Sequence, residues 1–512
     1  MPLTVRLAGY NVDADLLTQV IDLLGQIDRE IAGRISSLEP SDCRVLLAEL
    51  VEKAHAGMNL EAFTPETIAA AYARISRDPK QIGELRRAAR FAVARARKSN
   101  DTIIFGYGHA SVAEHACFNL DILGLSRLAT EELQSHRLVS FTEKSQRYIT
   151  LSADFVIPPE LTADSHWEKR LGEAVPRSFA AYEEACRHLT DMYRGQQSGV
   201  PSSHALQEIE NRAKEDARYL LPLCCATQMG MTVNARNLEH ITCDLSDHPL
   251  QELRDLGKAL RETGAGLAPS LVKYTSRGSY PRQNRAQLKR IFTAGATEET
   301  QIISRPSVRL LASTPDAEER VLRALAFTSG MDGNSLSDES SRSQMWKEVF
   351  RNISSHDGPM REFELADLTF ETELSASCFA QIKRHRMMTL LKQPYSVSAS
   401  AILPRSFEEA GISALFRTSL DQSRQLAQAL ESQYPDLAPY LLTNAHVRKV
   451  ILHINVRELY HFARLRCDGH AQWEVRDLAD QMLEIARREW PNLTAMAVGA
   501  DRFAERYREM FG

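Results

Sequence analysis

Apolar residues recur at helical spacing along most of the chain, with charged residues between them. The pattern is clear in residues 62–76, 83–98 and 407–433, and it predicts amphipathic helices there. Shorter stretches rich in apolar and β-branched residues predict strands. These stretches are residues 4–10, 148–158 and 307–313. Helix therefore dominates, and we expect a helix-rich α+β fold.

Two polar stretches interrupt the periodic pattern. Between about residues 262 and 304 the chain becomes rich in Gly, Ser, Pro and Arg, including Arg277 and Arg282, which indicates a domain seam or an exposed arm. Residues 329–344 form a second polar run, rich in Ser, Asp and Gly, which predicts a surface loop.

Length and charge narrow the class of protein. The chain has 512 residues, of which 43% are hydrophobic and 25% charged, so it can bury more than one core. The net charge of -5 gives no overall attraction to nucleic acid or to an anionic membrane, so an anionic ligand must be held by local arginines. The first residues lack the pattern of a secretory signal, and no apolar stretch approaches the roughly 20 residues needed to cross a bilayer. We therefore expect a cytoplasmic protein.

The cysteines are scattered along the chain without any CxxC pair. They are Cys43, Cys117, Cys186, Cys224, Cys225, Cys243, Cys378 and Cys467. This spacing favours reduced, mostly buried thiols over a disulfide framework or a zinc site. A thiolate nucleophile would need a helix N-terminus or a neighbouring cation, which the sequence does not indicate.

Four pairs of segments resemble one another, in the same order, in the two halves of the chain. The pairs are TVRLAGYNVDADLL with SVRLLASTPDAEERVL, ELQSHRLVSF with QIKRHRMMTL, LLPLCCATQMGMTVNARNLEHI with YLLTNAHVRKVILHINVRELYHF, and DHPLQELRDLG with GHAQWEVRDLA. Chance similarity would not preserve this order, so we predict an internal duplication. The alternative is generic similarity between amphipathic helices.

The densest polar segment of the first half is residues 135–148, SHRLVSFTEKSQRY. Arg147 and Ser145 suit a phosphate, because a guanidinium binds its oxygens in pairs and a serine hydroxyl adds a donor. Glu143 would accept hydrogen bonds from a ribose or a ring N–H. Taken alone, such a charged run is more typical of a solvated helix face.

Three segments together resemble a known family. Residues 135–148 resemble the RHRxxSxNExSxRY signature of the flavin-dependent thymidylate synthases. Residues 108–115, GHASVAEH, resemble the family's GHxSxxEH segment, and residues 455–474 resemble its N-x-R-x-L, LR and HAQWE stretch. The resemblance covers nearly the whole chain, once per half.

The resemblance implies a fold with two tandem thymidylate synthase-like domains, each with a small, mostly antiparallel sheet and several long helices. We expect an N-terminal domain at residues 1–270, a basic linker or arm at 271–303 and a C-terminal domain at 304–512.

The resemblance also implies an activity. Members convert dUMP to dTMP: methylenetetrahydrofolate supplies the carbon, FAD relays it and NADPH reduces the flavin. Arg466 occupies the family position that stabilises negative charge developing on the uracil ring, a role suited to a side chain that stays protonated. Because the flavin carries the hydride and one-carbon steps, no cysteine nucleophile is required.

The resemblance assigns further side chains to the ligands. Those for dUMP are Gln381, Arg384, Glu143, Ser145, Gln146, Arg147 and Arg218. Those for FAD are Ser111, His136, Arg137, Arg384, His385, Arg386, Asn234, Arg236, His240, Asn455, Arg457, His461 and His470. His109 is placed beside the folate or the FAD. We expect no metal, because His109 and His115 do not share a helix face.

Neither half keeps the family signature intact. In the first half, Ser135 and Glu132 replace the leading arginine and the glutamine before it, and residues 243–245 lack the LR arginine. The second half keeps those arginines but has lost the glutamate, serine and arginine that should follow, together with the match to Arg218. The replaced positions are Lys392, Pro394, Ser396 and Pro439. The losses are therefore complementary.

Members of the resembled family form homotetramers whose sites draw residues from several subunits. We therefore expect a homodimer of this chain to form a pseudo-tetramer of four domains, with about two working composite sites. Each site would combine the following side chains from the two halves: Ser145, Arg147, Arg218, Gln381, Arg384 and Arg466.

Two other functions stay open. The first is a related flavin-dependent one-carbon transfer to, or hydroxymethylation of, another pyrimidine nucleotide, because Thr142 and Gln146 stand where the family usually has asparagine and glycine. The second is a non-catalytic protein that binds a nucleotide or a flavin. Arg466 argues against the second function, because a binding protein would not need an arginine placed for ring activation.

Overall fold

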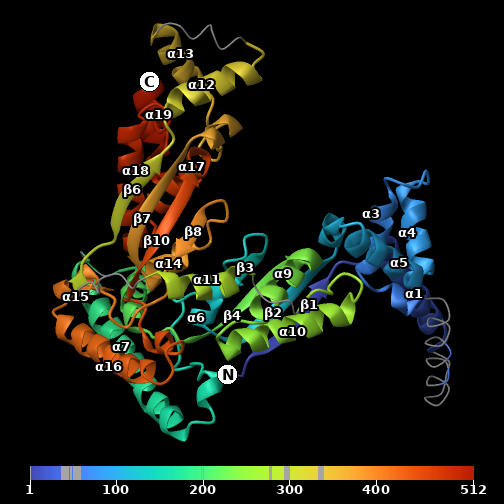
Figure 1. Cartoon of the computed structure of the whole chain (residues 1–512), viewed down its shortest axis with the longest axis horizontal. Coiled ribbons are helices and arrows are strands. Elements are labelled where there is room, and N and C mark those ends of the chain that lie inside the picture. Colours follow the sequence, from blue (N-terminus) through green and yellow to red (C-terminus); the bar gives the residue numbers. More distant parts are fainter. Residues whose placement is uncertain are drawn as a thin grey trace.

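The computed structural model of the chain describes residues 2–35, 45, 49, 59–197, 199, 201–275, 280–292, 300–331 and 339–512. Cys43, Arg277, residues 332–338 of the polar run and parts of the predicted linker 271–303 lie outside the described residues. The described chain forms two elongated arms that diverge from a common base of helices (Figure 1).

The first arm is built on a four-stranded antiparallel sheet with strand order β1-β2-β4-β3. Its strands are β1 (Thr4–Tyr10), β2 (Cys117–Ser126), β4 (Ala226–Asn234) and β3 (Ser140–Glu143). Alternate residues of β2 are buried, as in a sheet with one covered face. The helices that follow its strands are α6 (Arg127–Leu133), α9 (Ala235–Leu245) and α10 (Gln251–Leu267). At the outer end of the arm lie α1 (Ala14–Ile35), α3 (Glu66–Arg74), α4 (Ile82–Phe91) and α5 (Val93–Asn100).

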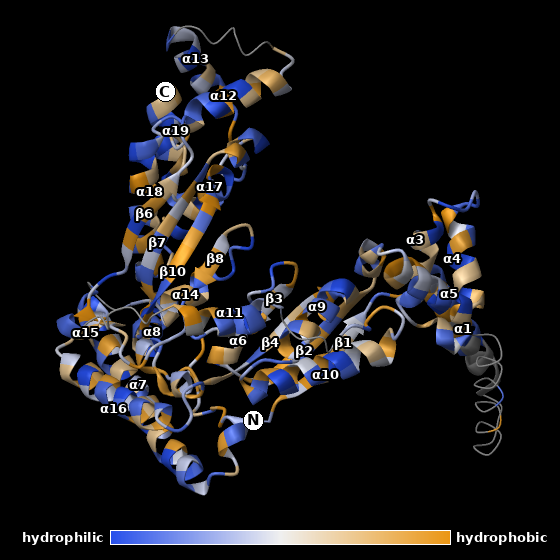
Figure 2. Ribbon diagram, viewed as in Figure 1, coloured by the Kyte–Doolittle hydropathy of each residue, from blue (hydrophilic) through white to orange (hydrophobic). Residues whose placement is uncertain are grey.

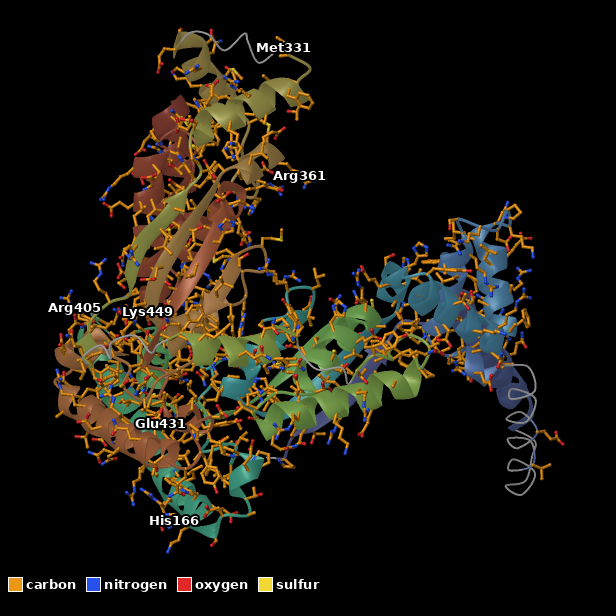
Figure 3. All side chains as sticks on the ribbon, viewed as in Figure 1. His166, Met331, Arg361, Arg405, Glu431 and Lys449 are labelled. Carbon is orange, nitrogen blue, oxygen red and sulfur yellow. The ribbon has the colours of Figure 1, made fainter. Side chains whose placement is uncertain are left out.

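The second arm repeats this topology with strand order β6-β7-β10-β8. Its strands are β6 (Ser307–Ser313), β7 (Asp367–Ser375), β10 (Val447–Asn455) and β8 (Thr389–Lys392). Its helices are α12 (Ala317–Thr328), α13 (Glu339–Phe350), α14 (Ala376–Ile382), α17 (Val456–Arg466), α18 (Trp473–Glu489) and α19 (Phe503–Phe511). Figure 3 places Met331 and Arg361 at the outer end of this arm and Lys449 near its base. The helix-rich α+β fold with two tandem domains is therefore confirmed, while the limits 1–270, 271–303 and 304–512 remain a prediction.

Both halves contribute helices to the common base. These helices are α7 (Ser165–Gly195) and α8 (Ser203–Ala217) from the first half, and α15 (Arg405–Glu409) and α16 (Ser413–Glu431) from the second. Trp167 and Tyr182 belong to the same buried apolar cluster as Phe407 and Phe416. The halves therefore share one core at the base and cannot separate without exposing it.

The two halves of the chain meet and cross at a pair of equivalent segments, residues 219–224 and 440–445. Their backbones exchange hydrogen bonds, including Leu223 N to Leu442 O at 2.8 Å and Asn444 N to Leu221 O at 2.9 Å. Tyr219 donates its hydroxyl proton to Glu474 of the other half, and Tyr440 donates to Glu252 at 2.6 Å.

Each of these glutamates also binds its own half. Ser126, the N-cap of α6, donates to Glu252 from its amide and its hydroxyl, at 2.6 and 2.7 Å. Ser375, the N-cap of α14, donates to Glu474 in the same way, at 2.9 and 2.5 Å. The crossing therefore has approximate twofold symmetry within a single chain.

The helices predicted from periodicity are confirmed at α3, α4, α5 and α16, and the strands predicted at 4–10 and 307–313 are β1 and β6. The strand predicted at 148–158 is wrong. This segment pairs only at an isolated bridge between Phe155 and Cys225, and it runs into Pro158 and Pro159, which lack the N–H donors of a ladder.

The surface loop predicted at 329–344 is also wrong in its last part. Residues 339–344 begin helix α13, where Trp346 and Phe350 pack into the second core and stabilise the helix. The described cysteines form no disulfide with one another, and most of them are buried. Within the part of the chain that the structure describes, no helix combines the length and apolar character required to span a bilayer.

We expect Tyr440→Phe to lower the free energy of unfolding by about 1–3 kcal/mol, because it removes a donor from a buried carboxylate. Burial raises the pKa of Glu252, while the hydrogen bonds from Tyr440 and Ser126 oppose that rise. Chemical denaturation measures the change. Tyr434→Phe is the matched control, because its hydroxyl binds Asp164 at 3.2 Å near the surface and its loss should cost little. Equal stability of the two variants would contradict a structural role for the crossing.

Candidate functional site

Four arginines from both halves gather where the second arm meets the base. Arg147 follows β3, and Arg218 begins the short 3-10 turn Arg218–Leu220 after α8. Arg384 follows α14, and Arg466 is the last residue of α17. Arg147 Nη2 lies 3.5 Å from the carbonyl oxygen of His470, which follows Arg466 closely in sequence. A single chain therefore assembles this arginine cluster.

Arg218 is the most deeply buried member of the cluster, with 3% of its surface exposed. Its Nε donates to the carbonyl oxygen of Glu215 at 3.2 Å, and its Nη2 is buried without a hydrogen-bond partner. Within the described part of the chain, no carboxylate forms an ion pair with it. Burial lowers the pKa of Arg218; Glu215 opposes the shift, and Arg147 and Arg127 add to it.

Arg466 also lacks an acidic partner among the described residues. It donates from Nη2 to the carbonyl oxygen of Gln381 at 2.9 Å and from Nε to His385 Nε2 at 3.0 Å. Burial, and then the positive charges of Arg147 and Arg384, lower the pKa of Arg466 to about 10. Because a cation that is withdrawn from water without an acidic partner is unfavourable, the buried Arg218 and the partly buried Arg466 together form a site that an anion would stabilise.

His385 holds Arg466 in place from the other side. Since its Nε2 accepts from Arg466, its Nδ1 carries the ring proton, and that atom faces Glu458 Oε1 at 3.4 Å. His461 lies beside it, with the ring centroids 5.8 Å apart. Ligand atoms of His385, Glu458 and His461 fall within 4.8 Å of one another, but this tautomer leaves His385 no free lone pair for a metal.

Glu143 anchors the cations beneath the cluster. It accepts hydrogen bonds from Arg127, from Gln134 at 3.0 Å and from Arg384 at 3.4 Å. Burial alone would raise the pKa of Glu143, but Arg127, Lys383 and Arg384 lower it to about 2. Its two oxygens are thus engaged by protein donors.

Lys383 lies in the same buried group, 3.8 Å from Glu143. Burial and the nearby Arg127 lower the pKa of Lys383 to about 7, against the opposing effect of Glu143 and Glu131. Its side chain therefore changes charge near neutral pH, next to the arginine cluster.

The loop that carries Arg147 is held on both sides. Arg147 pairs with Glu215, and its amide donates to Ser145 Oγ at 3.1 Å. Gln146 Oε1 accepts from Asn444 Nδ2 at 3.1 Å, and Asn444 also donates to the carbonyl oxygen of Arg218 at 3.0 Å. The seven side chains predicted for dUMP and the predicted catalytic Arg466 are therefore brought together by the structure.

The side chains predicted for FAD are spread over three places. His385, Arg386, His461 and His470 belong to the second half near the cluster, and Arg386, His461 and His470 are exposed. His136 and His240 lie near each other in the first half, where His136 Nε2 is 3.8 Å from Asp244. Arg137 reaches across to Thr389 Oγ1 at 3.0 Å.

The remaining predicted FAD residues are distant from the cluster. Asn234 and Asn455 are N-caps of α9 and α17, at the outer ends of β4 and β10. Arg236 and Arg457 bind acids in the same regions, at 2.5 Å from Glu114 and 3.0 Å from Glu364. His109 contacts Arg77 at 3.2 Å, and Ser111 is exposed in the adjacent 3-10 turn. Asn455 and Arg466 lie at opposite ends of the 11-residue helix α17, about 16 Å apart, so Asn455 and Arg457 do not contact the arginine cluster within a single chain.

Sequence reasoning missed several members of the site: Arg127, Gln134, Glu215, Lys383 and Glu458. Lys383 and Gln134 occupy equivalent positions beside the RHR segment in the two copies, and this adjacency was the available signal. Glu458 occupies a variable position of the 455–474 motif, and Arg127 and Glu215 lie outside the motifs, so only the packing of α6, α8 and α17 reveals these three.

Comparison with known proteins places the chain in a family. The model of the family "Thymidylate synthase complementing protein" matches residues 59–270 and again residues 309–492. A flavin-dependent thymidylate synthase of Clostridium tetani is 33% identical over 178 residues, which cover 34% of this chain and 68% of that protein. A UPF0159 protein of Thermoplasma acidophilum is 22% identical over 449 residues, covering 77% of this chain and 87% of the relative.

Among solved structures, a UMP/dUMP methylase, PolB from Streptomyces cacaoi bound with 5-Br dUMP, is similar with a TM-score of 0.35 and 19% identity, covering 39% of this chain and 98% of that one. The family match occurs once in each half and together spans most of the chain. The chain therefore belongs to the thymidylate synthase complementing protein family, the family of the flavin-dependent thymidylate synthases.

Proposed function

We propose that the chain is an FAD-dependent thymidylate synthase that converts dUMP to dTMP in a composite site formed by both of its domains. One observation carries this proposal. Arg218 of the first half is buried, Arg466 of the second is partly buried, and both lie in one cluster without a carboxylate partner among the described residues.

The phosphate of dUMP would bind the side of the cluster that comes from the first half. Arg218 has a buried, unpartnered Nη2, and Arg147 stands beside it on a fixed loop with Ser145. A guanidinium binds phosphate oxygens in pairs, and burial strengthens that attraction.

The uracil ring would lie against the side that comes from the second half. Arg466 is fixed by Gln381 and His385, so its charge is already oriented before a ligand binds. Negative charge developing on the ring would meet this charge in a poorly solvated place, where electrostatic stabilisation is large.

The exposed side chains beside the cluster suit FAD. Arg386, His461 and His470 offer exposed hydrogen-bond donors within reach of a pyrophosphate or an adenine. The flavin, once bound, supplies the redox and one-carbon relay chemistry, with NADPH and methylenetetrahydrofolate as co-substrates. The chain's own residues bind and orient the nucleotide.

A second candidate is one-carbon transfer or hydroxymethylation at another pyrimidine nucleotide. Gln146 favours it, because its oxygen binds Asn444 and its amide nitrogen is then the end available to a ligand. A non-catalytic binding protein is the third possibility, and the orientation of Arg466 argues against it.

We also propose that two chains pair as a homodimer, a pseudo-tetramer of four domains, in the cytoplasm. Exposed apolar side chains support the pairing: Leu138, Met387 and Leu391 are 70%, 69% and 53% exposed. Leu138 and Met387 precede β3 and β8, and Leu391 lies within β8; the ends of both strands face the space between the two arms (Figure 1). Large exposed apolar groups on adjacent elements are typical of an interface.

The purified protein should be yellow, and with dUMP, methylenetetrahydrofolate and NADPH it should add a methyl group to the nucleotide, as read by mass spectrometry. Arg466→Ala should lower kcat about 10²–10³-fold, because it removes one oriented charge from the transition state. Arg464→Ala is the control, since that side chain binds the carbonyl oxygens of His356 and Asp357 instead. A hydroxymethylated product would select the second candidate, and a colourless protein unable to bind FAD would exclude both enzymes.

Inorganic phosphate should raise the midpoint of thermal unfolding, because an anion that binds only the folded chain stabilises it. Arg218→Met should abolish this response. The same change should raise the free energy of unfolding without phosphate by about 1–3 kcal/mol, since it removes an unpaired buried charge. A phosphate response that persists in Arg218→Met would show that the anion binds elsewhere.

Mixing Arg147→Ala chains with Arg466→Ala chains should restore no activity. The structure brings both side chains together within one chain, so every site in a mixed dimer would lack one of them. The assay is dTMP formation after the two variants are unfolded and refolded together. Recovery of about one quarter of the activity would mean that the site combines different chains.

A further inference from the structure

The internal repeat gives the arginine cluster an equivalent position at a second junction between the two halves. The chain's own side chains fill that second position. It lies between α6 of the first half and β8 and β10 of the second. Here Lys392 and Tyr395 stand at the repeat positions of Glu143 and Gln146, while Pro439 and Leu245 stand at those of Arg218 and Arg466. We propose, on the basis of the function proposed above, that this second junction is closed to nucleotides and that each chain binds one dUMP.

A buried ion pair fills the centre of the second junction. Arg448 Nη2 lies 2.6 Å from Glu131 Oε2, and the two side chains are 4% and 2% exposed. The Arg448 guanidinium lies over the rings of Phe379 and Tyr395, 3.8 and 4.3 Å from their centroids. Tyr395 also donates its hydroxyl proton to Glu131 Oε1 at 3.0 Å. The carboxylate thus takes the place that a ligand anion would need.

A second ion pair closes the edge of the same junction. Lys392 Nζ lies 2.8 Å from Glu132 Oε2 and 3.3 Å from the carbonyl oxygen of Glu131. Burial would raise the pKa of Glu132, but Lys392, His248 and Arg282 lower it to about 2. Both cations of this junction therefore have an acidic partner, in contrast to Arg218 and Arg466.

Helix α11 (Tyr280–Ile291), in the predicted linker 271–303, covers the remaining side of the second junction. Arg282 donates to the carbonyl oxygen of Asp244 and lies 2.6 Å from Asp247 Oδ1, and Gln283 binds Asp247 at 3.3 Å. Asp244 and Asp247 flank Leu245, which stands where the second half has Arg466. Figure 2 shows α11 as mostly hydrophilic, so polar contacts hold it there. Helix α11 of the linker therefore covers the second junction.

Calorimetric titration of the FAD-loaded protein with dUMP tests the proposal. We expect one dUMP per chain, and no detectable binding to Arg147→Ala, because the second junction contributes nothing. Two dUMP per chain, or one remaining in Arg147→Ala, would overturn the closed junction while leaving the proposed activity intact.

If the protein binds no dUMP at all, the proposed function fails. Thermal unfolding of variants then tests separately whether the buried ion pair closes the second junction. We expect Glu131→Gln and Arg448→Met each to lower the thermal midpoint, because each leaves a buried charge unpaired, and the double variant to recover part of the loss. The control pair is Arg309 and Glu371, 3.0 Å apart at the surface, whose matching variants should shift the midpoint little. Unchanged midpoints in the Glu131 and Arg448 variants would overturn the closure.

Discussion

The rest of the structure depends on two buried glutamates that each need donors from both halves of the chain. Glu474 is satisfied by Ser375 of its own half and by Tyr219 of the other, and Glu252 by Ser126 and Tyr440. A buried carboxylate that loses a donor is costly, so the two domains cannot shift independently. This constraint also places the site, because Arg218 directly precedes Tyr219. Gln472, which donates to the Tyr219 hydroxyl at 3.0 Å, likewise fixes the segment after Arg466.

The crossing of the two halves is approximately symmetric, but the charged side chains on its two sides are not. On one side Arg218 and Arg466 have no acidic partner among the described residues, and burial lowers the pKa of each. On the other side Arg448 and Lys392 are paired with Glu131 and Glu132. Unpaired buried charge destabilises a fold but prepares it for an anion, whereas paired charge with stacked rings contributes to a packed interface. The same backbone arrangement therefore carries unpaired arginines on one side and paired, stacked charges on the other.

The sequence predicted the fold well because repeated, collinear segments carry both the strands and the motifs. β1 and β6 follow directly from the repeat, and the structure places near one another the four arginines that the divided signature groups, Arg147, Arg218, Arg384 and Arg466. Residues 148–158 have strand-like composition but find only a single bridge, since strand formation depends on a partner that composition does not reveal. The Glu131–Arg448 ion pair could not be predicted from the sequence either, because the two residues are 317 positions apart and belong to no motif.

A fusion of two copies of one domain would allow the two junctions to differ. In an assembly of identical single domains, any substitution appears at every junction, so a change that fills one site fills all of them. Two domains in one chain vary separately. Glu131 stands where the second half has Ala380, and Arg448 where the first half has Thr227. The ion pair therefore forms at one junction, while the equivalent positions at the other remain small and uncharged. On the proposed function, a buried charge that would abolish binding in an assembly of identical domains is compatible with one open site per chain, because the charge lies at the other junction.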